Sequence, residues 1–456
     1  MYTAFVSKLM FPLHERFKSH TSVAVRRGME VTQWWSAERL QALQVERLRA
    51  LLIEVGKHVP YYGTLFKRMQ FDPRAVASLA DLQVLPLLDK ATIRAQTEAL
   101  KHQQARGLAR FNTGGSSGEP LIFFIGKERV SHDVAAKWRA TRWWGVDIGD
   151  PEMVVWGSPI ELGAQDRVRR IRDKLLRTQL LPAFEMSDAR VDGFIASIRQ
   201  RRPRMLFGYP SALAHIARHA QARGIAMDDL GIKVAFVTSE RLYDDQRATI
   251  GRAFGCGVAN GYGGRDAGFI AHECPSGGMH VTAEDIIVET IGPDGWPAPA
   301  GQPGEIVTTH LATRDFPFIR YRTGDVAVLG SAPCACGRGL PLIKELQGRT
   351  TDFVLAADGT VMHGLALIYI LRDLPGVRSF KIVQETLQHT LVQLVVDDRF
   401  ARAQSADIVA AFQSRLGAAV HVDLQFVEHI AAEKSGKFRY VVSRVAGQPA
   451  AAQSPA

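Results

Sequence analysis

The sequence TGGSSG at residues 113–118 places three glycines and two serines beside a threonine. Glycines allow the backbone amides to turn inward, and the hydroxyls of Thr113, Ser116 and Ser117 can donate hydrogen bonds to phosphate oxygens. A phosphate loop of the kinase and GTPase type has a lysine after its last glycine and opens a helix. Here Glu119 stands at that position and an apolar strand follows. The stretch therefore indicates a phosphate loop of another kind, with a flexible hairpin loop as the alternative.

Three side chains in the middle of the chain have the chemistry to bind a nucleotide. Asp325 ends the run TGD, and one carboxylate can accept hydrogen bonds from both hydroxyls of a ribose. Tyr262 offers a flat face for adenine, and Asp266 offers a carboxylate for the Mg²⁺ that accompanies ATP. Each has a structural alternative: a turn cap for the first aspartate, a core position for the tyrosine, and an ion pair with Arg265 for Asp266.

A lysine close to the C-terminal end could act with these groups. Lys437 lies in the run SGKFR, where the glycine frees the loop and the ammonium group can reach both a carboxylate and an α-phosphate. The alternative is a solvated lysine in a β-turn, and Lys434 is a competing candidate three residues earlier.

Three of the four cysteines lie near glycines and histidines. Cys274 and His280 lie in HECPSGGMH, and Cys334 and Cys336 lie in CACGR. Three thiolates and one imidazole satisfy a tetrahedral Cys₃His metal site, with His272 as an alternate ligand. The other interpretation is a set of reduced surface cysteines.

The composition is that of an ordinary soluble protein, with 456 residues, 46% hydrophobic and 22% charged, which predicts two or three domains. No apolar run approaches the roughly 18 residues of a membrane helix, so we expect a protein that does not span a membrane. The first 20 residues lack a long apolar segment and a cleavage site, which favours a cytoplasmic location. Four cysteines without a signal peptide argue against a disulfide framework. Cys256 is interpreted as a buried packing residue.

The net charge of +10 indicates an anionic ligand, a nucleic acid or an anionic membrane surface as a partner, or simply a solvated surface. The dense basic clusters, at 169–177 and 199–204, are not interleaved with aromatic residues as a face for single-stranded nucleic acid would be. We therefore expect anionic small-molecule substrates and no nucleic acid.

The spacing of apolar residues predicts an α/β protein. Leucines at three- and four-residue intervals predict helices from residue 37 to about 70, and Asp89 is expected to cap a helix from about Lys90. Between 120 and 310, short apolar runs alternate with helical stretches, which predicts parallel-rich sheets. An Asp-Gly hairpin signal then opens a small α+β unit. The predicted parts are a large N-terminal domain 1–348, a mobile C-terminal domain 349–447 and a disordered tail 448–456.

Five segments in order resemble the motifs of adenylate-forming enzymes, whose phosphate loop has the form T-S-G-S-[ST]-G-x-P. Besides the loop at 113–120, VTSERL resembles their adenine-side segment, NGYGGRDAG their aromatic-glycine motif, FPFIRYRTGD their ribose-binding stretch and EKSGKFR their C-terminal lysine motif. The runs VPYYGTLF, C-x-C-G-R and LQGRTTD are similar to the phenylacetate–CoA ligase-like and capsule-biosynthesis CapK-like branch. The resemblance covers about residues 40–445. Departures are Gly114, where serine is common, and Asp266, where glutamate is common.

The resemblance implies a role for each matching residue. It implies catalytic roles for Lys437, which matches the family's Gly-Lys pair, and Asp266, a hinge at Asp352, and a structural zinc held by Cys274, His280, Cys334 and Cys336. The implied nucleotide-binding residues are Thr113, Gly115, Ser116, Ser117, Gly118, Ser239, Glu240, Tyr262, Gly263, Asp325 and Arg349. The implied acid pocket contains Trp156, Tyr209, Gly261 and Gly264.

The activity that the resemblance implies is carboxylic acid activation by Mg²⁺-ATP. An acyl-adenylate would form and coenzyme A would then be acylated. One alternative keeps adenylation but transfers the acyl group to an amine, a hydroxyl or a carrier-protein thiol. A second alternative, suggested by Gly114 and Asp266, is a nucleotide-binding module without catalysis. A homodimer is a further expectation.

Overall fold

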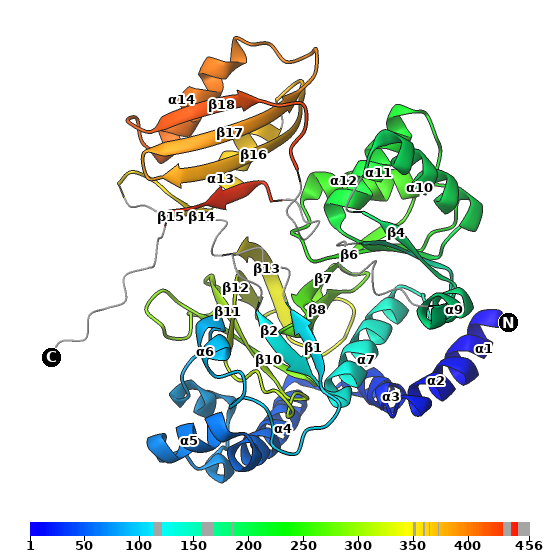
Figure 1. Cartoon of the computed structure of the whole chain (residues 1–456), viewed down its shortest axis with the longest axis vertical. Helices are drawn as coiled ribbons and strands as arrows, with labels where there is room; N and C mark the ends of the chain where they lie inside the picture. Colours follow the sequence, from blue (N-terminus) through cyan, green and yellow to red (C-terminus); the bar gives the residue numbers. More distant parts are fainter. Residues whose placement is uncertain are drawn as a thin grey trace.

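Helices form the N-terminal part of the protein and strands dominate its centre (Figure 1). The computed structural model describes residues 1–112, 121–156, 167–183, 186–349, 353–358, 361–363, 365–372, 374–431 and 439–445. The first helices are α1 (Tyr2–Phe5), η1 (Val6–Met10), α2 (Phe11–Phe17), α3 (Ser22–Thr32), α4 (Ala37–His58), α5 (Pro60–Met69), η2 (Pro73–Ala75), η3 (Leu79–Val84) and α6 (Lys90–Ala95). The helices predicted between 37 and about 70 are confirmed, and the Asp89 side chain caps α6 by accepting from the backbone N–H of Thr92.

An eleven-stranded sheet has the order β10-β11-β12-β13-β9-β8-β7-β6-β5-β3-β4. The strands from β4 to β7 pair in parallel, and every other pair in this sheet is antiparallel. The predicted α/β fold is therefore confirmed, with the parallel character confined to one side of the sheet. The strands are β3 (Glu152–Trp156), β4 (Thr178–Pro182), β5 (Met205–Gly208), β6 (Val234–Thr238), β7 (Gly257–Gly264), β8 (Gly268–Glu273), β9 (Met279–Val281), β10 (Ile286–Ile291), β11 (Gly304–His310), β12 (Tyr321–Gly330) and β13 (Leu342–Arg349).

The parallel strands are buried on both faces because helices cover both. On β6, Ala235 and Val237 join one buried cluster with Leu213 of α11, whereas Phe236 joins another with Ala140 of α7. This alternation explains why such strands consist almost entirely of apolar residues. The covering helices are α7 (Lys127–Trp143), α9 (Arg167–Leu176), α10 (Asp188–Arg201), α11 (Pro210–Ala222) and α12 (Asp244–Phe254).

A separate hairpin brackets the predicted phosphate loop. Strands β1 (Ala109–Asn112) and β2 (Ile122–Ile125) pair antiparallel, with Asn112 opposite Ile122. Residues 113–120 lie outside the described residues, but the chain on either side of them is held together by this pair.

The C-terminal part has its own sheet and its own core. The sheet has the order β18-β17-β16-β19, and two helices contribute Leu367 and Phe412 to a cluster with Ile382 and Val392. The predicted hairpin is confirmed by the antiparallel pair β14 and β15. The elements are β14 (Phe353–Leu355), β15 (Val361–His363), α13 (Leu365–Arg372), β16 (Val377–Thr386), β17 (His389–Val396), α14 (Gln404–Leu416), β18 (His421–Phe426) and β19 (Val441–Ser443).

No helix among the described residues has the length and apolar character that crossing a membrane requires.

Candidate functional site

The carboxyl ends of the parallel strands gather several predicted site residues at one edge of the sheet. Trp156 ends β3, Tyr209 follows β5, Ser239 follows β6, and Gly261 lies in β7 opposite the last residue of β6. Ligands of open α/β sheets bind at this edge, because the connecting loops there are free to vary. The topology thus places the predicted adenine-side segment beside the predicted acid pocket.

Tyr262 and Asp325 meet from strands that are distant in the sheet order. The Tyr262 hydroxyl donates a hydrogen bond to Oδ2 of Asp325 at 2.9 Å and lies 3.5 Å from Oγ1 of Thr323. Strands β7 and β12 are four places apart, which would be about 19 Å in a flat sheet. The sheet therefore curves, and the curvature brings the predicted adenine and ribose residues into one site.

Asp266 lies at the turn between β7 and β8 and is held on both carboxylate oxygens. Tyr321 donates its hydroxyl to Oδ2 at 2.6 Å, and the backbone N–H of Ala267 donates to Oδ1 at 3.1 Å. A Cβ on Gly264 would lie 2.6 Å from Oδ1, so a larger residue there would displace the Asp266 carboxylate from this position. Tyr321 was not predicted as a site residue, although it lies inside the motif IRYRTGD.

A buried arginine of α7, Arg129, donates hydrogen bonds to the backbone of the same turn. Both Nη atoms of Arg129 donate to the carbonyl oxygen of Asp266, at 3.3 and 3.4 Å, and its Nε donates to Asp133 at 2.9 Å. Burial raises the pKa of Asp133 above its usual range even though Arg129 opposes that change. Gly268 has φ +89°, and a Cβ there would lie 2.9 Å from the Arg129 guanidinium and from His310. No motif in the sequence pointed to Arg129.

The adenine-side segment has a strained backbone and an anchoring carboxylate. Ser239 has φ +71°, a left-handed conformation that is uncommon for a residue other than glycine. The next residue, Glu240, accepts a hydrogen bond from the backbone N–H of Ser211 at 3.2 Å, in the first turn of α11. A carboxylate is favoured at a helix N-terminus, so this contact fixes the segment against the loop that carries Tyr209.

The predicted acid-pocket residues belong to a row of aromatic rings. Trp156 stacks on Tyr209 with ring centroids 4.4 Å apart and on Phe207 at 5.9 Å, and Phe207 stacks on Phe236 at 6.0 Å. A Cβ on Gly261 would lie 2.7 Å from Phe236, so glycine lets this ring sit against β7. The structure therefore joins three of the four predicted residues, whereas Gly264 belongs to the Asp266 turn.

The remaining predicted residues either neighbour Tyr262 and Asp325 or lie outside the described part of the chain. Arg349 is the last residue of β13, and its backbone pairs with that of Asp325; Gly263 lies in β7 beside Tyr262. The predicted residues outside the described part of the chain are Thr113, Gly115, Ser116, Ser117, Gly118, Asp352 and Lys437.

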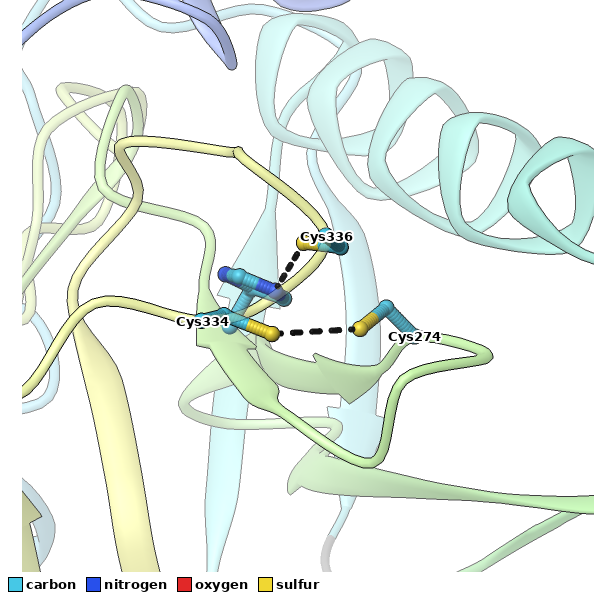
Figure 2. A group of neighbouring side chains, drawn as sticks. Cys274, Cys334 and Cys336 are labelled. Carbon is cyan, nitrogen blue, oxygen red and sulfur yellow. Dashed lines mark hydrogen bonds between the residues drawn. The ribbon is translucent and has the colours of Figure 1, made fainter.

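The predicted Cys₃His group is assembled, with its four donor atoms within 4.8 Å of one another (Figure 2). The sulfurs of Cys274 and Cys334 are 3.7 Å apart, and Sγ of Cys336 lies 3.2 Å from Nε2 of His280. Two sulfurs on a tetrahedral zinc are separated by about 3.8 Å, given Zn–S distances near 2.3 Å. A disulfide would need about 2.05 Å, so the spacing fits a metal and not a disulfide.

The surroundings of this group also suit a cation. His280 Nδ1 lies 3.4 Å from the carbonyl oxygen of Leu340, which leaves Nε2 directed at the sulfurs. Burial lowers the pKa of His280 to about 4, so its imidazole is neutral, as a metal ligand must be. A Cβ on Gly278 would lie 2.5 Å from the Cys334 sulfur, so a glycine is needed for the loop to close around the donors.

His272, the predicted alternate ligand, is not part of the Cys₃His group. Its ring stacks on Phe269 with centroids 5.6 Å apart and lies 5.9 Å from Phe236. Its two ring nitrogens have no hydrogen-bond partner among the described residues. The His272 side chain therefore packs among aromatic rings and not with the four donor atoms, a difference that its closeness to Cys274 in the sequence does not reveal.

The comparisons with known proteins agree with this arrangement. Residues 354–444 match the family model described as the CapK C-terminal domain. Protein CapK of Staphylococcus aureus is 22% identical over 95% of this chain and 94% of its own length. Phenylacetate-coenzyme A ligase of Thermus thermophilus is 25% identical over 82% of this chain and 85% of its own. A crystal structure of 2-hydroxyisobutyryl-CoA ligase in the postadenylation state covers 90% of both chains, with 20% identity and a TM-score of 0.72.

The fold, the ordered motifs and the relatives point to one family. Tyr262 and Asp325, from two of those motifs, share one site. The C-terminal match and the nearly full-length similarity both point to CapK. The chain is therefore similar over most of its length to CapK and to phenylacetate-coenzyme A ligase, its residues 354–444 match the CapK C-terminal domain, and its fold is that of a CoA ligase that forms an acyl-adenylate.

Proposed function

We propose that the protein activates a carboxylic acid with ATP and transfers the acyl group to coenzyme A. The carboxylate oxygen attacks the α-phosphorus of ATP, the bond to the β-phosphate breaks, and pyrophosphate leaves. The CoA thiol then attacks the acyl carbon, loses its proton to water, and AMP leaves. The observation that carries this proposal is the contact of Tyr262 with Asp325, since it unites an aromatic face with a carboxylate that suits a ribose diol.

Each group in the site has a distinct part in the proposed reaction. Asp325 binds the ribose hydroxyls, Tyr262 lies against adenine, and residues 113–118 cover the β- and γ-phosphates. Lys437 stabilises the negative charge that develops on the α-phosphate in the transition state. Trp156 and Tyr209 form an apolar wall for the acid, which suits an aryl or other apolar group.

Asp266 is the proposed Mg²⁺ ligand. Its carboxylate is only partly buried, and carboxylate oxygens are preferred ligands of this ion. Asp266 would hold the ion, which would supply positive charge beside the pyrophosphate leaving group. Tyr321 and Arg129 are positioning residues, because they hold the aspartate side chain and its backbone respectively.

A structural Zn²⁺ at the Cys₃His group is also part of the proposal. Cys274 directly follows β8 and His280 lies in β9, whereas Cys334 and Cys336 lie between β12 and β13. A zinc ion would therefore tie the strand after Asp266 to the turn after Asp325. Both sides of the proposed nucleotide site would be fixed by one ion.

The arrangement of parts remains as proposed from the sequence: a domain 1–348, a mobile domain 349–447 that turns about Asp352 between the two half-reactions, and a tail 448–456. A cytoplasmic location and a homodimer complete the proposal.

A second candidate function changes only the acyl acceptor. The match of residues 354–444 to the CapK C-terminal domain supports it, because this part of the chain resembles a CapK protein and not specifically a CoA ligase. In this alternative an amine, a hydroxyl or a carrier-protein thiol replaces CoA. A third candidate, binding of nucleotide without catalysis, rests on Gly114 and Asp266.

The test is acid-dependent pyrophosphate exchange over a panel of aryl, fatty and amino acids, followed by thioester formation with and without CoA. Exchange with at least one acid and a CoA-dependent thioester are expected. Exchange without any CoA product would favour the second candidate. ATP binding without exchange for any acid would overturn the proposed activity. Asp325→Ala serves as the control that weakens the ATP-dependent signal.

A further inference from the structure

The first helical segment of the protein exposes a line of large apolar side chains. Elements α1, η1 and α2 run without interruption from Tyr2 to Phe17. Val6, Phe11 and Glu15 are buried. The opposite side carries what we call the apolar stripe, whose members are 43–88% exposed: Tyr2, Phe5, Leu9, Leu13 and Phe17. Monomeric proteins rarely leave so continuous an apolar surface open to water.

The spacing of the stripe explains how it stays on one side. Its members are three or four residues apart, and in a regular α-helix each four-residue step drifts by about 40° around the axis, given 3.6 residues per turn. Residues Val6–Met10 form a π-helical turn, which is wider and reduces this drift. The stripe therefore faces one direction over most of its length.

Helix α9 continues this surface. The Tyr2 hydroxyl donates to the carbonyl oxygen of Leu175 at 2.8 Å, and the Arg177 guanidinium lies 5.5 Å from the Tyr2 ring centre. Figure 1 shows α9 beside α1 at the N-terminal end of the chain. On α9, Ile171 and Leu175 are exposed one turn apart. Two helices that are distant in sequence thus contribute to one apolar face.

The charges around this face are basic. Lys8, Arg16 and Lys18 are exposed beside the stripe, as are Lys174 on α9 and Arg177 directly after it. Glu15, the single acidic residue in positions 1–18, is buried and bonded to Ser22 at 2.7 Å. On α9, Asp173 is paired with Arg172. An apolar stripe flanked by basic side chains is the composition of helices that lie in a membrane interface.

A second copy of the chain suits this face less well. A two-fold symmetric pair brings the same patch of both copies together, so Lys8 and Arg16 would face like charges without an exposed acid of the same helix to pair with. The protein also carries a net charge of +10. Anionic phospholipid headgroups offer the opposite charge and an apolar layer beneath it.

We propose that residues 1–18 and α9 bind the surface of a membrane that contains anionic phospholipid, with the apolar stripe inserted among the headgroups. The protein does not cross the bilayer in this arrangement. The nucleotide site lies on β7 and β12, apart from these helices, and stays in water. The proposal is independent of the function proposed above.

The test is co-sedimentation of the full chain with vesicles of phosphatidylcholine alone or mixed with phosphatidylglycerol. We expect the protein to bind only the mixed vesicles, and we expect added salt to weaken this binding. The double variants Phe5→Ser/Leu9→Ser and Leu13→Ser/Phe17→Ser should each weaken binding more than about tenfold, since each removes two inserted apolar side chains. Lys8→Glu/Arg16→Glu should do the same. Trp296→Ser, an exposed tryptophan in the turn between β10 and β11, is the matched control and should bind normally.

Circular dichroism melting and sedimentation velocity complete the experiment. Each variant should melt like the wild type, because the replaced side chains are exposed. The proposal is overturned if the wild type fails to bind mixed vesicles. It is also overturned if both stripe variants bind these vesicles as tightly as the wild type does. A dimer that the stripe substitutions convert to a monomer, without vesicle binding, also overturns it and assigns the face to self-association.

Discussion

The Tyr262 hydroxyl donates to Asp325 across 63 positions of the chain, at 2.9 Å. This contact fixes the distance between the proposed adenine face and the proposed ribose carboxylate before any nucleotide binds. Pre-positioned groups lose less entropy on binding. The consequence is that the two residues should contribute unequally, since one supplies charge and the other mainly a ring face.

Asp325→Ala should lower kcat/KM for ATP by about tenfold to a hundredfold, because hydrogen bonds to a charged group contribute about 1.5–3 kcal/mol each. Tyr262→Phe keeps the ring and should cost less than about tenfold. Pyrophosphate exchange at varied ATP concentration measures both. Equal losses for the two variants would contradict the assigned roles.

The contact between Tyr321 and Asp266 makes a second prediction. Tyr321→Phe removes the hydroxyl that holds Oδ2 at 2.6 Å, so the carboxylate should rotate more freely. We expect the Mg²⁺ concentration for half-maximal exchange to rise several-fold, while Asp266→Asn raises it further. Tyr61→Phe, a half-buried tyrosine on α5, is the control. An unchanged Mg²⁺ dependence in both site variants would remove Asp266 from metal binding.

The Cys₃His group predicts a bound metal and a loss of stability without it. Elemental analysis of the purified protein should find about one zinc per chain, as a four-ligand site requires. Cys274→Ser and Cys336→Ser should lose the metal and melt at a lower temperature. Cys256→Ser, whose thiol lies outside the group, should keep it. Full metal content in the Cys274→Ser variant would show that the ion lies elsewhere.

The buried histidine His310 predicts a loss of stability in acid. Burial, together with Arg129 and His132, holds the pKa of His310 well below its usual value. In the unfolded chain histidine titrates near pH 6.5, so the unfolded state takes up this proton first as the pH falls. The stabilisation is present above about pH 6.5 and is lost progressively below it, by at most about 1.4 kcal/mol per pH unit.

Denaturant unfolding of the wild type and of His310→Asn between pH 7 and pH 4.5 measures this effect. The variant should show a shallower decline of its unfolding free energy. His429→Asn, at an exposed position, should follow the wild type. Parallel curves for the wild type and His310→Asn would show that another group is responsible.

Much of the fold follows from local sequence pattern, because strands buried on both faces are apolar throughout and amphipathic helices are not. The curvature of the sheet, in contrast, could not be predicted from local sequence pattern. The meeting of β7 with β12 depends on contacts across many strands, and no local pattern encodes them. Tyr321 escaped prediction for the same reason, since its partner Asp266 is 55 positions away. Arg129 lies in a helix without a motif, and only its burial reveals its role.

The apolar stripe was also missed, for another physical reason. A search for a membrane helix asks for a continuous apolar run, whereas an interfacial helix needs only one apolar side. Phe5, Leu9, Leu13 and Phe17 satisfy the second condition with charged residues between them. Their spacing alone does not separate an exposed stripe from a buried one, because a core-facing helix has the same pattern. The structure distinguishes the two cases, because Val6 and Phe11 are the buried side chains of this helical segment and the stripe is exposed.

Lys437 separates the two half-reactions of the proposed enzyme. If its ammonium stabilises the charge on the α-phosphate, Lys437→Ala should reduce acid-dependent pyrophosphate exchange by about 10²–10³-fold, the usual loss for a single group that stabilises developing charge. Thioester formation from chemically supplied acyl-adenylate and CoA should remain close to wild type, because that step does not form a bond to phosphorus. Lys434→Ala is the control and should keep both activities. Loss of both half-reactions in Lys437→Ala, or loss of exchange in Lys434→Ala alone, would assign the catalytic role to a different residue.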